Sequence, residues 1–268
     1  MKFWKMSGSG NDFVFIDARG DDLLARRASD PDFVRRVCAP HTGVGSDGVA
    51  IIQTSSQQDF DLTYLNRDGS LGELCGNASL CATRLAVELG AAHPDNLSFR
   101  TGAGIIHGRI RDGQPEIDLQ PPTGVRPDAG ISKLGGEQRM GFANTGVPHL
   151  VIRTESVDLA DLGNRGPELR YHASLPSGAN VNWVSRTKDG WTMRTYERGV
   201  EAETLACGTG AVACAILLAA WGESGTETRL RTRSGRTLTV RIGGTPERPQ
   251  PSLSGEGRIV FEGMLREL

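Results

Sequence analysis

Residues 64–77 read Tyr64-Leu-Asn-Arg-Asp-Gly-Ser-Leu-Gly-Glu-Leu-Cys75-Gly76-Asn77, and residues 196–209 read Tyr196-Glu-Arg-Gly-Val-Glu-Ala-Glu-Thr-Leu-Ala-Cys207-Gly208-Thr209. Each stretch places a cysteine and a glycine directly before an apolar segment with helical character. The two stretches lie 132 residues apart, and the same offset aligns further residues on both sides. The chain therefore carries one structural unit twice. The aligned pairs are Thr63 with Thr195, Tyr64 with Tyr196, Cys75 with Cys207, Gly76 with Gly208, Leu85 with Leu217, and Gly90 with Gly222.

A cysteine at the start of a helix has a particular chemical meaning. Unpaired backbone N–H groups and the positive end of the helix dipole favour an anion there, which lowers the pKa of a thiol. Two such sulfurs facing one cleft would make an acid and a base. The alternative is that both cysteines simply pack in the interior, as free cysteines commonly do. Their repetition in register favours the chemical interpretation.

Composition and charge narrow the class of protein. The chain has 268 residues, 38% of them hydrophobic, with 35 glycines and a formal net charge of −2. This composition is typical of a turn-rich globular chain, and the dispersed arginines argue against a nucleic-acid partner. No stretch approaches the roughly 18 apolar residues of a membrane span. Five cysteines, an odd number, favour a reducing compartment over a disulfide framework, so we expect a cytoplasmic protein without a membrane partner.

Hydrophobic periodicity predicts many short strands and few helices. A short helix is expected to begin at Ser29-Asp30-Pro31 and to end before Pro40. One long helix is expected in each half, at about 77–89 and 209–221. The predicted strands are 13–17, 49–53, 59–66, 97–101, 105–111 and 116–120 in the first half, and 150–153, 180–185, 192–197, 228–233, 237–242 and 258–261 in the second.

The segment 121–130 carries proline and glycine at a density typical of a boundary. It divides the chain into an N-terminal half, 1–122, with Cys75 and a C-terminal half, 123–268, with Cys207, the last strand being able to pack back on the first half. We predict an α+β fold of two pseudo-symmetric domains, each a mostly antiparallel sheet wrapped around its long helix. The active site is expected in the cleft between the domains.

The spacing of the remaining cysteines weakens two other interpretations. Cys75 and Cys81 are six residues apart, and Cys207 and Cys214 are seven apart. Neither spacing matches a C-x-x-C redox pair or a common zinc site, so no metal is expected. Cys38, Cys81 and Cys214 are predicted to pack.

Taken together, the motifs resemble those of the diaminopimelate epimerases, a family of cofactor-independent amino acid racemases and epimerases. The resemblance covers nearly the whole chain, and its pieces follow the family's order. They are Lys5-Met-Ser-Gly-Ser-Gly-Asn-Asp-Phe13, Gly43-Val-Gly-Ser-Asp-Gly48, Asn66-Arg-Asp-Gly-Ser70, Cys75-Gly-Asn77, Gly146-Val-Pro-His149, Asn180-Val-Asn182, Glu197-Arg-Gly199 and Cys207-Gly-Thr-Gly-Ala211.

The resemblance implies an isomerase that converts LL-2,6-diaminopimelate to meso-diaminopimelate, in lysine and peptidoglycan precursor biosynthesis, without a cofactor. Inversion needs a base on one face of the α-carbon and an acid on the other, and Cys75 and Cys207 would supply them as thiolate and thiol. His149 and Glu197 would tune the thiol pKa. The family also suggests a homodimer acting on a small diamino dicarboxylate.

The expected substrate contacts fall into two groups. The α-carboxylate, which gains charge as the proton leaves, would meet the helix starts at Gly76, Asn77, Gly208 and Thr209. The distal amino acid group would be held by Asn11, Asn66, Asn180, Glu197 and Arg198, because a carboxylate favours a guanidinium fork and an ammonium favours a carboxylate.

Three departures from the commonest family pattern affect the distal site: the segment Ala78-Ser79-Leu80, Val147 in place of asparagine, and Ser7 in place of a frequent histidine. They leave open a racemase or epimerase of another amino acid, histidine or proline-like, with the same cysteine pair. A noncatalytic ligand-binding protein of the same duplicated fold and a thiol-disulfide oxidoreductase are the alternatives from other classes.

Overall fold

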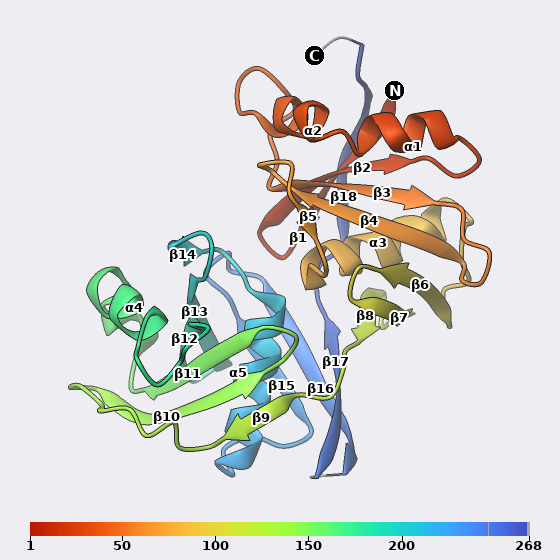
Figure 1. Cartoon of the computed structure of the whole chain (residues 1–268). Helices are drawn as coiled ribbons and strands as arrows, with labels where there is room; N and C mark the ends of the chain where they lie inside the picture. The colour runs from red at the N-terminus through yellow and green to blue at the C-terminus, as the bar shows by residue number, and fades with distance from the viewer. Residues whose placement is uncertain (246, 267–268) are drawn as a thin grey trace. The chain divides into compact units, whose positions relative to one another are not determined.

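The computed structural model describes residues 1–245 and 247–266, and its contacts divide the chain into two compact units (Figure 1). Unit 1 comprises Met1–Ile117 together with the chain from Ser254 onward, and unit 2 comprises Asp118–Leu253. The halves predicted from the repeat, 1–122 and 123–268, remain a prediction.

Unit 1 is a mixed sheet in which antiparallel pairs predominate. Strands β18, β1 and β2 pair antiparallel, β2 pairs with β3 in parallel, and β3 and β4 are again antiparallel. β4 pairs with short β5 and, in parallel, with β6, which continues antiparallel into β7 and β8. The elements are β1 (Lys2–Gly8), β2 (Asn11–Asp17), α1 (Asp22–Ala28), α2 (Pro31–Cys38), β3 (Gly48–Gln53), β4 (Phe60–Asn66), β5 (Leu71–Gly72), α3 (Gly76–Glu88), β6 (Leu97–Thr101), β7 (Gly104–Arg111), β8 (Gln114–Asp118) and β18 (Arg258–Met264).

Unit 2 repeats this order. β9, β10 and β11 pair antiparallel, β11 pairs with β12 in parallel, and β12 and β13 are antiparallel. β13 pairs with short β14 and, in parallel, with β15, which continues into β16. The elements are β9 (Thr123–Arg126), β10 (Glu137–Asn144), β11 (Pro148–Thr154), η1 (Val157–Leu159), α4 (Leu162–Arg170), β12 (Asn180–Thr187), β13 (Gly190–Glu197), β14 (Ala202–Thr204), α5 (Gly208–Ala220), β15 (Glu227–Arg231), β16 (Thr237–Thr245) and β17 (Arg248–Ser254).

The repeat read from the sequence is also a repeat of topology. The parallel pair Phe60 with Phe99 in unit 1 has its counterpart, at the same offset of 132 residues, in Thr192 with Arg231 in unit 2. Helix α5 lies at that offset from α3. The prediction of two pseudo-symmetric α+β units is confirmed.

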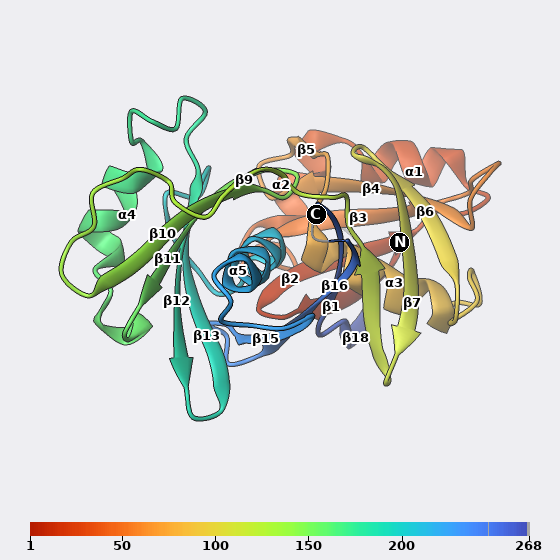
Figure 2. The same cartoon turned by 90° about the horizontal axis from the view of Figure 1, so that it is seen from below.

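A 13-residue helix lies at the centre of each sheet. Helix α3 packs on β1, β3, β7 and β18, and α5 packs on β10, β11, β12, β15 and β16. Figure 2 shows α5 nearly end-on, with strands of its own unit around it. Every residue from Gly210 to Leu218 is buried, because this helix has no polar face that could lie in water. The long helices predicted at 77–89 and 209–221 are confirmed, and each observed end lies within one residue of the predicted one.

Local capping places the shorter helix α2 as expected. Asp30 is its N-cap, and the Asp30 side chain accepts a hydrogen bond from the Phe33 backbone N–H. Pro31 occupies the first helical position, where the missing N–H costs nothing.

Several elements were not predicted, and each has a physical reason. Strand β1 is buried at four consecutive positions, Phe3–Met6, so the period-two pattern is absent. Helix α4 contains Pro167 and two glycines, which disfavour a helix, yet Asp161 caps its start. Strand β9 begins inside the proline- and glycine-bearing segment because β10 supplies its hydrogen bonds. The strand expected at 116–120 lies at 114–118.

The stacked rings of Phe60 and Phe99 test the core of unit 1. Their centroids are 4.8 Å apart and neither side chain is exposed. We expect Phe60→Ala to lower the free energy of unfolding by about 3–5 kcal/mol, since the cavity cannot be filled by water at low cost. Urea denaturation measures this. Leu159→Ala is the control, because Leu159 is 84% exposed and its loss should change stability by less than about 0.5 kcal/mol.

Candidate functional site

The two repeated cysteines occupy the same structural position. Each is the N-cap of its central helix, with φ −124° and ψ 111° at Cys75 of α3 and φ −136° and ψ 111° at Cys207 of α5. The backbone N–H groups of the first helical residues, 76–77 and 208–209, have no partners within their own helices by the geometry of a helix start. Both sulfurs therefore lie beside a ready-made anion site.

The two sulfurs nevertheless differ in surroundings. The Sγ of Cys207 accepts a hydrogen bond from the Gly210 backbone N–H at 3.4 Å and lies 3.7 Å from the hydroxyl oxygen of Thr209. Cys75 makes no side-chain capping bond to α3 and is only half-buried, whereas Cys207 is 7% exposed.

At the start of α3, Asn77 connects to the N-terminal strands. Its Nδ2 donates to Oδ1 of Asn11 at 2.7 Å, and Nδ2 of Asn11 donates to Asp47 at 3.1 Å. The Asn77 side chain is 2% exposed, and its Oδ1 has no hydrogen-bond partner within the part of the chain that the structure describes. A buried carbonyl oxygen without a partner costs free energy of folding.

Asn66 has a local role in the structure. Its Nδ2 donates to the Ser70 hydroxyl at 3.0 Å, and its backbone N–H donates to the Ser70 carbonyl at 2.8 Å. The amide thus stabilises the turn that leads toward Cys75.

His149 lies in the interior of unit 2. Strand β11 pairs with β10 on one side and with β12 on the other, and the His149 side chain is fully buried. Its Nε2 lies 3.0 Å from the Thr209 hydroxyl and its Nδ1 lies 3.1 Å from Nδ2 of Asn182. Burial, with a smaller contribution from the charge of Arg198, lowers the pKa of His149 to about 3, so the ring is neutral at physiological pH.

The other predicted residues of unit 2 gather where β12 begins and β13 ends. Oδ1 of Asn180 accepts from the Arg198 backbone N–H at 2.8 Å, and Nδ2 of Asn180 donates to the Pro148 carbonyl at 3.2 Å. Arg198 donates from Nη1 to the Ser177 carbonyl at 3.1 Å. The carboxylate of Glu197 accepts from the Thr204 hydroxyl at 2.7 Å.

Two residues beside Cys207 were absent from the sequence prediction. Asn182 lies on β12 two positions after Asn180, so both side chains are on the same face of the sheet. Gly210 has so little room that an added Cβ would lie 2.4 Å from Oδ1 of Asn182 and 3.1 Å from the Cys207 sulfur. The signal in the sequence was the Asn-x-Asn pair of the motif 180–182.

The remaining cysteines are structural. Cys38, Cys81 and Cys214 are buried, and burial raises the pKa of each thiol. Cys38 also lies 3.2 Å from the Ser46 hydroxyl. The prediction that these three pack is confirmed.

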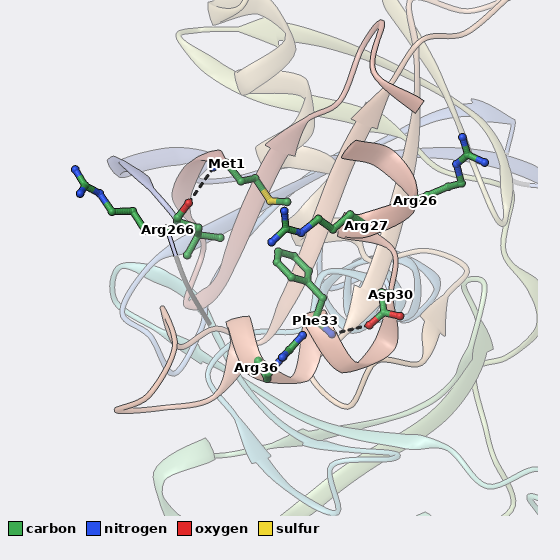
Figure 3. Close-up of a pocket in the computed structure, with 8 residues that line it drawn as sticks. Met1, Arg26, Arg27, Asp30, Phe33, Arg36 and Arg266 are labelled. Carbon is green, nitrogen blue, oxygen red and sulfur yellow. Dashed lines mark hydrogen bonds between the residues drawn. The ribbon is translucent and has the colours of Figure 1, made fainter. Parts of the chain in front are cut away.

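A cavity of about 870 Å³ lies away from these residues, between α1, α2 and the C-terminal segment (Figure 3). No predicted site residue lines it. Among the described residues, no group of three histidine, cysteine, aspartate or glutamate side chains is placed to hold a metal ion, and no helix is both long and apolar enough to cross a membrane. The cavity is lined by Met1, Arg26, Arg27, Asp30, Phe33, Arg36, Leu265 and Arg266.

The chain is similar to known proteins over its whole length. A family model described as diaminopimelate epimerase matches residues 3–123 and 141–247. A diaminopimelate epimerase of Gemmatimonas aurantiaca is 46% identical, and the match covers 100% of both chains. One of Aquifex aeolicus is 42% identical, and the match covers 100% of this chain and 98% of that protein. Among solved structures, a phenazine biosynthesis protein of the PhzF family from Bacillus anthracis has a TM-score of 0.72 at 15% identity, covering 100% of this chain and 99% of that one. The last likeness shows the fold alone.

The burial of His149 predicts a pH dependence of stability. The folded-state pKa is about 3, whereas an unfolded histidine titrates near 6.5, so below pH 6.5 the unfolded chain binds a proton that the folded chain does not. Stability should fall as the pH drops, with His149 contributing a loss of roughly 2–3 kcal/mol between pH 7 and 4.5. Urea denaturation across this range measures it. His149→Gln should flatten the dependence, and His107→Gln, at an exposed histidine, should not; equal slopes in all three proteins would refute the assignment.

Proposed function

Because the chain belongs to the diaminopimelate epimerase family, we propose that it is an isomerase that inverts one α-carbon of LL-2,6-diaminopimelate to give the meso form. This reaction serves lysine and peptidoglycan precursor biosynthesis. The observation that carries the proposal is the pair of cysteines, each the N-cap of a buried helix at the equivalent place in a duplicated unit.

We propose that Cys75 and Cys207 act on opposite faces of the α-carbon. One cysteine, as thiolate, removes the α-proton and becomes a thiol. The other, as thiol, delivers its proton to the opposite face and becomes a thiolate. No bond to sulfur survives the cycle, and the roles exchange for the substrate of opposite configuration. Each cysteine must therefore function in both protonation states.

The helix starts suit the charge that develops during this reaction. As the α-proton leaves, negative charge moves onto the α-carboxylate, and preorganised donors stabilise such charge most effectively. The backbone N–H groups of Gly76, Asn77, Gly208 and Thr209 are the donors that we assign to it.

For the distal amino acid group we propose Asn11, Asn66, Asn180, Glu197 and Arg198. Arg198 supports this role because its guanidinium has further N–H donors beyond the one bound to Ser177. Glu197 supports it because Thr204 holds its carboxylate in place to meet an ammonium. Asn180 contributes by anchoring the backbone of Arg198.

Val147 removes a side-chain amide from this site without altering the turn that holds it. The Thr145 backbone N–H donates to the Val147 carbonyl at 3.1 Å, so the loop before His149 is held by main-chain atoms. The family match does not favour the alternative of a histidine or proline-like racemase. A homodimer and a cytoplasmic location are part of the proposal and rest on family membership.

Replacing either cysteine tests the two-base reaction. We expect Cys75→Ala and Cys207→Ala each to abolish epimerisation, because inversion needs a proton donor or acceptor on both faces. Conversion between LL- and meso-diaminopimelate measures it, and deuterium incorporation from heavy water into the α-position is compared among diaminopimelate, lysine, histidine and proline. Cys38→Ala is the matched control at a cysteine outside the site. Turnover like that of the unmodified protein in either site variant would refute the mechanism, and reduction of a disulfide substrate would favour an oxidoreductase.

Arg198 tests recognition of the distal group. Loss of a charge-assisted contact costs about 1.5–3 kcal/mol, so Arg198→Ala should lower kcat/KM for diaminopimelate by roughly ten- to a hundredfold. Slow α-proton exchange on simple amino acids should change little. Arg186→Ala, at an exposed arginine of β12, is the control. Equal losses on both kinds of substrate would place Arg198 at the reacting centre or in the fold.

A further inference from the structure

We propose that Asn182 is a positioning residue for the Cys207 thiolate. It acts through His149 and Thr209. In this chain of hydrogen bonds Asn182 donates to His149, His149 donates to Thr209, and Thr209 donates to the Cys207 sulfur. The proposal rests on the proposed function for its catalytic meaning, whereas the hydrogen-bond chain itself lies wholly within unit 2.

The first step is the orientation of the Asn182 amide. Its Nδ2 lies 3.1 Å from the Leu150 backbone carbonyl, and its Oδ1 accepts from the Thr195 hydroxyl at 2.9 Å. A carbonyl oxygen can only accept, so the NH₂ group must face Leu150. A flipped amide would place two oxygens against each other in a fully buried site. The second N–H of the same group then points to Nδ1 of His149 at 3.1 Å.

The second step is the tautomer of His149. Because Asn182 donates to Nδ1, that nitrogen must accept and cannot carry a proton. The neutral ring, buried and close to the charge of Arg198, therefore holds its single proton on Nε2. Nε2 lies 3.0 Å from the Thr209 hydroxyl oxygen, to which it donates.

The third step is the hydrogen bond from Thr209 to the Cys207 sulfur. The Thr209 oxygen accepts from His149, which leaves its own O–H free to donate to Sγ of Cys207 at 3.7 Å. The Thr145 hydroxyl donates to the Thr209 carbonyl at 3.0 Å and holds the first turn of α5 in place. With the N–H of Gly210, the sulfur receives two donors, and donors favour thiolate over thiol.

The arrangement belongs to unit 2 alone. At the offset of 132 residues, Asn182 corresponds to Ala50, Thr209 to Asn77, and Gly210 to Ala78. Ala50 has no side-chain amide and Asn77 has no hydroxyl, so these two positions cannot form the same chain in unit 1. The two cysteines therefore share a backbone position, but the chain of contacts from Asn182 reaches Cys207 alone.

Other ionisable groups interact with this chain of contacts. Arg198, after β13, interacts electrostatically with His149, and Cys214, on α5, with Cys207. Cys214 is fully buried with a pKa raised by burial, so it stays a neutral thiol in the pH range of the test.

The experiment measures the pKa of Cys207 in the full chain, without substrate, from the pH dependence of alkylation by iodoacetamide followed by mass spectrometry of the Cys207 peptide. Thr209→Val removes the hydroxyl and should raise the Cys207 pKa by about one to two units, a ten- to hundredfold slower alkylation at neutral pH. Thr209→Ser restores the hydroxyl and should restore the pKa. The Cys75 peptide is the internal control and should not change in either variant.

Asn182→Ala should raise the Cys207 pKa by less than Thr209→Val does, and the double variant should match Thr209→Val alone, because Asn182 acts only through the hydroxyl. Additive shifts, an unchanged pKa in Thr209→Val, or a Cys75 pKa that moves equally would overturn the proposal.

The unmodified protein provides a test that needs no substitution. Ring-nitrogen chemical shifts of His149 in an NMR spectrum distinguish the tautomers, and we expect the neutral form protonated on Nε2. A proton on Nδ1, or a protonated ring at neutral pH, would overturn the proposal even if Asn182→Ala fails to fold. Since neither measurement uses diaminopimelate, their outcome is separate from that of the epimerase assay.

Discussion

Unit 2 depends on the burial of a helix, α5, that has no polar side to expose. From Gly210 to Leu218, α5 presents only small and apolar side chains, and each large one gains about 1.5–3 kcal/mol on leaving water. A helix that is apolar on every side must be buried on every side. Strands β10, β11, β12, β15 and β16 all pack on α5. The backbone N–H groups of its first turn have no partners within the helix. Cys207 is the N-cap beside them.

Duplication of this unit supplies two equivalent helix starts, but the surroundings of the two cysteines differ. The structure contains that difference in the residues around each cysteine. In unit 1, Asn77 contacts Asn11, and its Oδ1 has no partner among the residues that the structure describes. In unit 2, Thr209 contacts His149 and the Cys207 sulfur. The same backbone position therefore has different side chains around it in the two units.

The known proteins that share the fold are more varied than those that are similar in sequence. A solved structure that is 15% identical to this chain shares its fold. Relatives at 42–46% identity are diaminopimelate epimerases. A fold of this kind supports more than one activity, so function has to be argued from side chains at the helix starts.

The sequence by itself determined the features that are local or repeated. The Asp30 cap of α2, the two long helices, and the cysteine before each of them follow from neighbouring residues and from the offset of 132 residues. Features set by distant partners did not follow. Strand β1 lacks alternation because both of its faces are covered, and α4 forms in spite of Pro167 because Asp161 caps it and the sheet buries Leu162 and Leu169.

Only the tertiary structure decided the surroundings of Cys207. His149, Asn182 and Thr209 come from β11, β12 and α5, and none of them neighbours another in the sequence. The direction of their hydrogen bonds depends on the Leu150 carbonyl, a backbone atom that no sequence motif encodes. Motifs can therefore predict which residue types reach a site, but donor and acceptor roles follow from buried partners that folding alone brings within 3.1 Å.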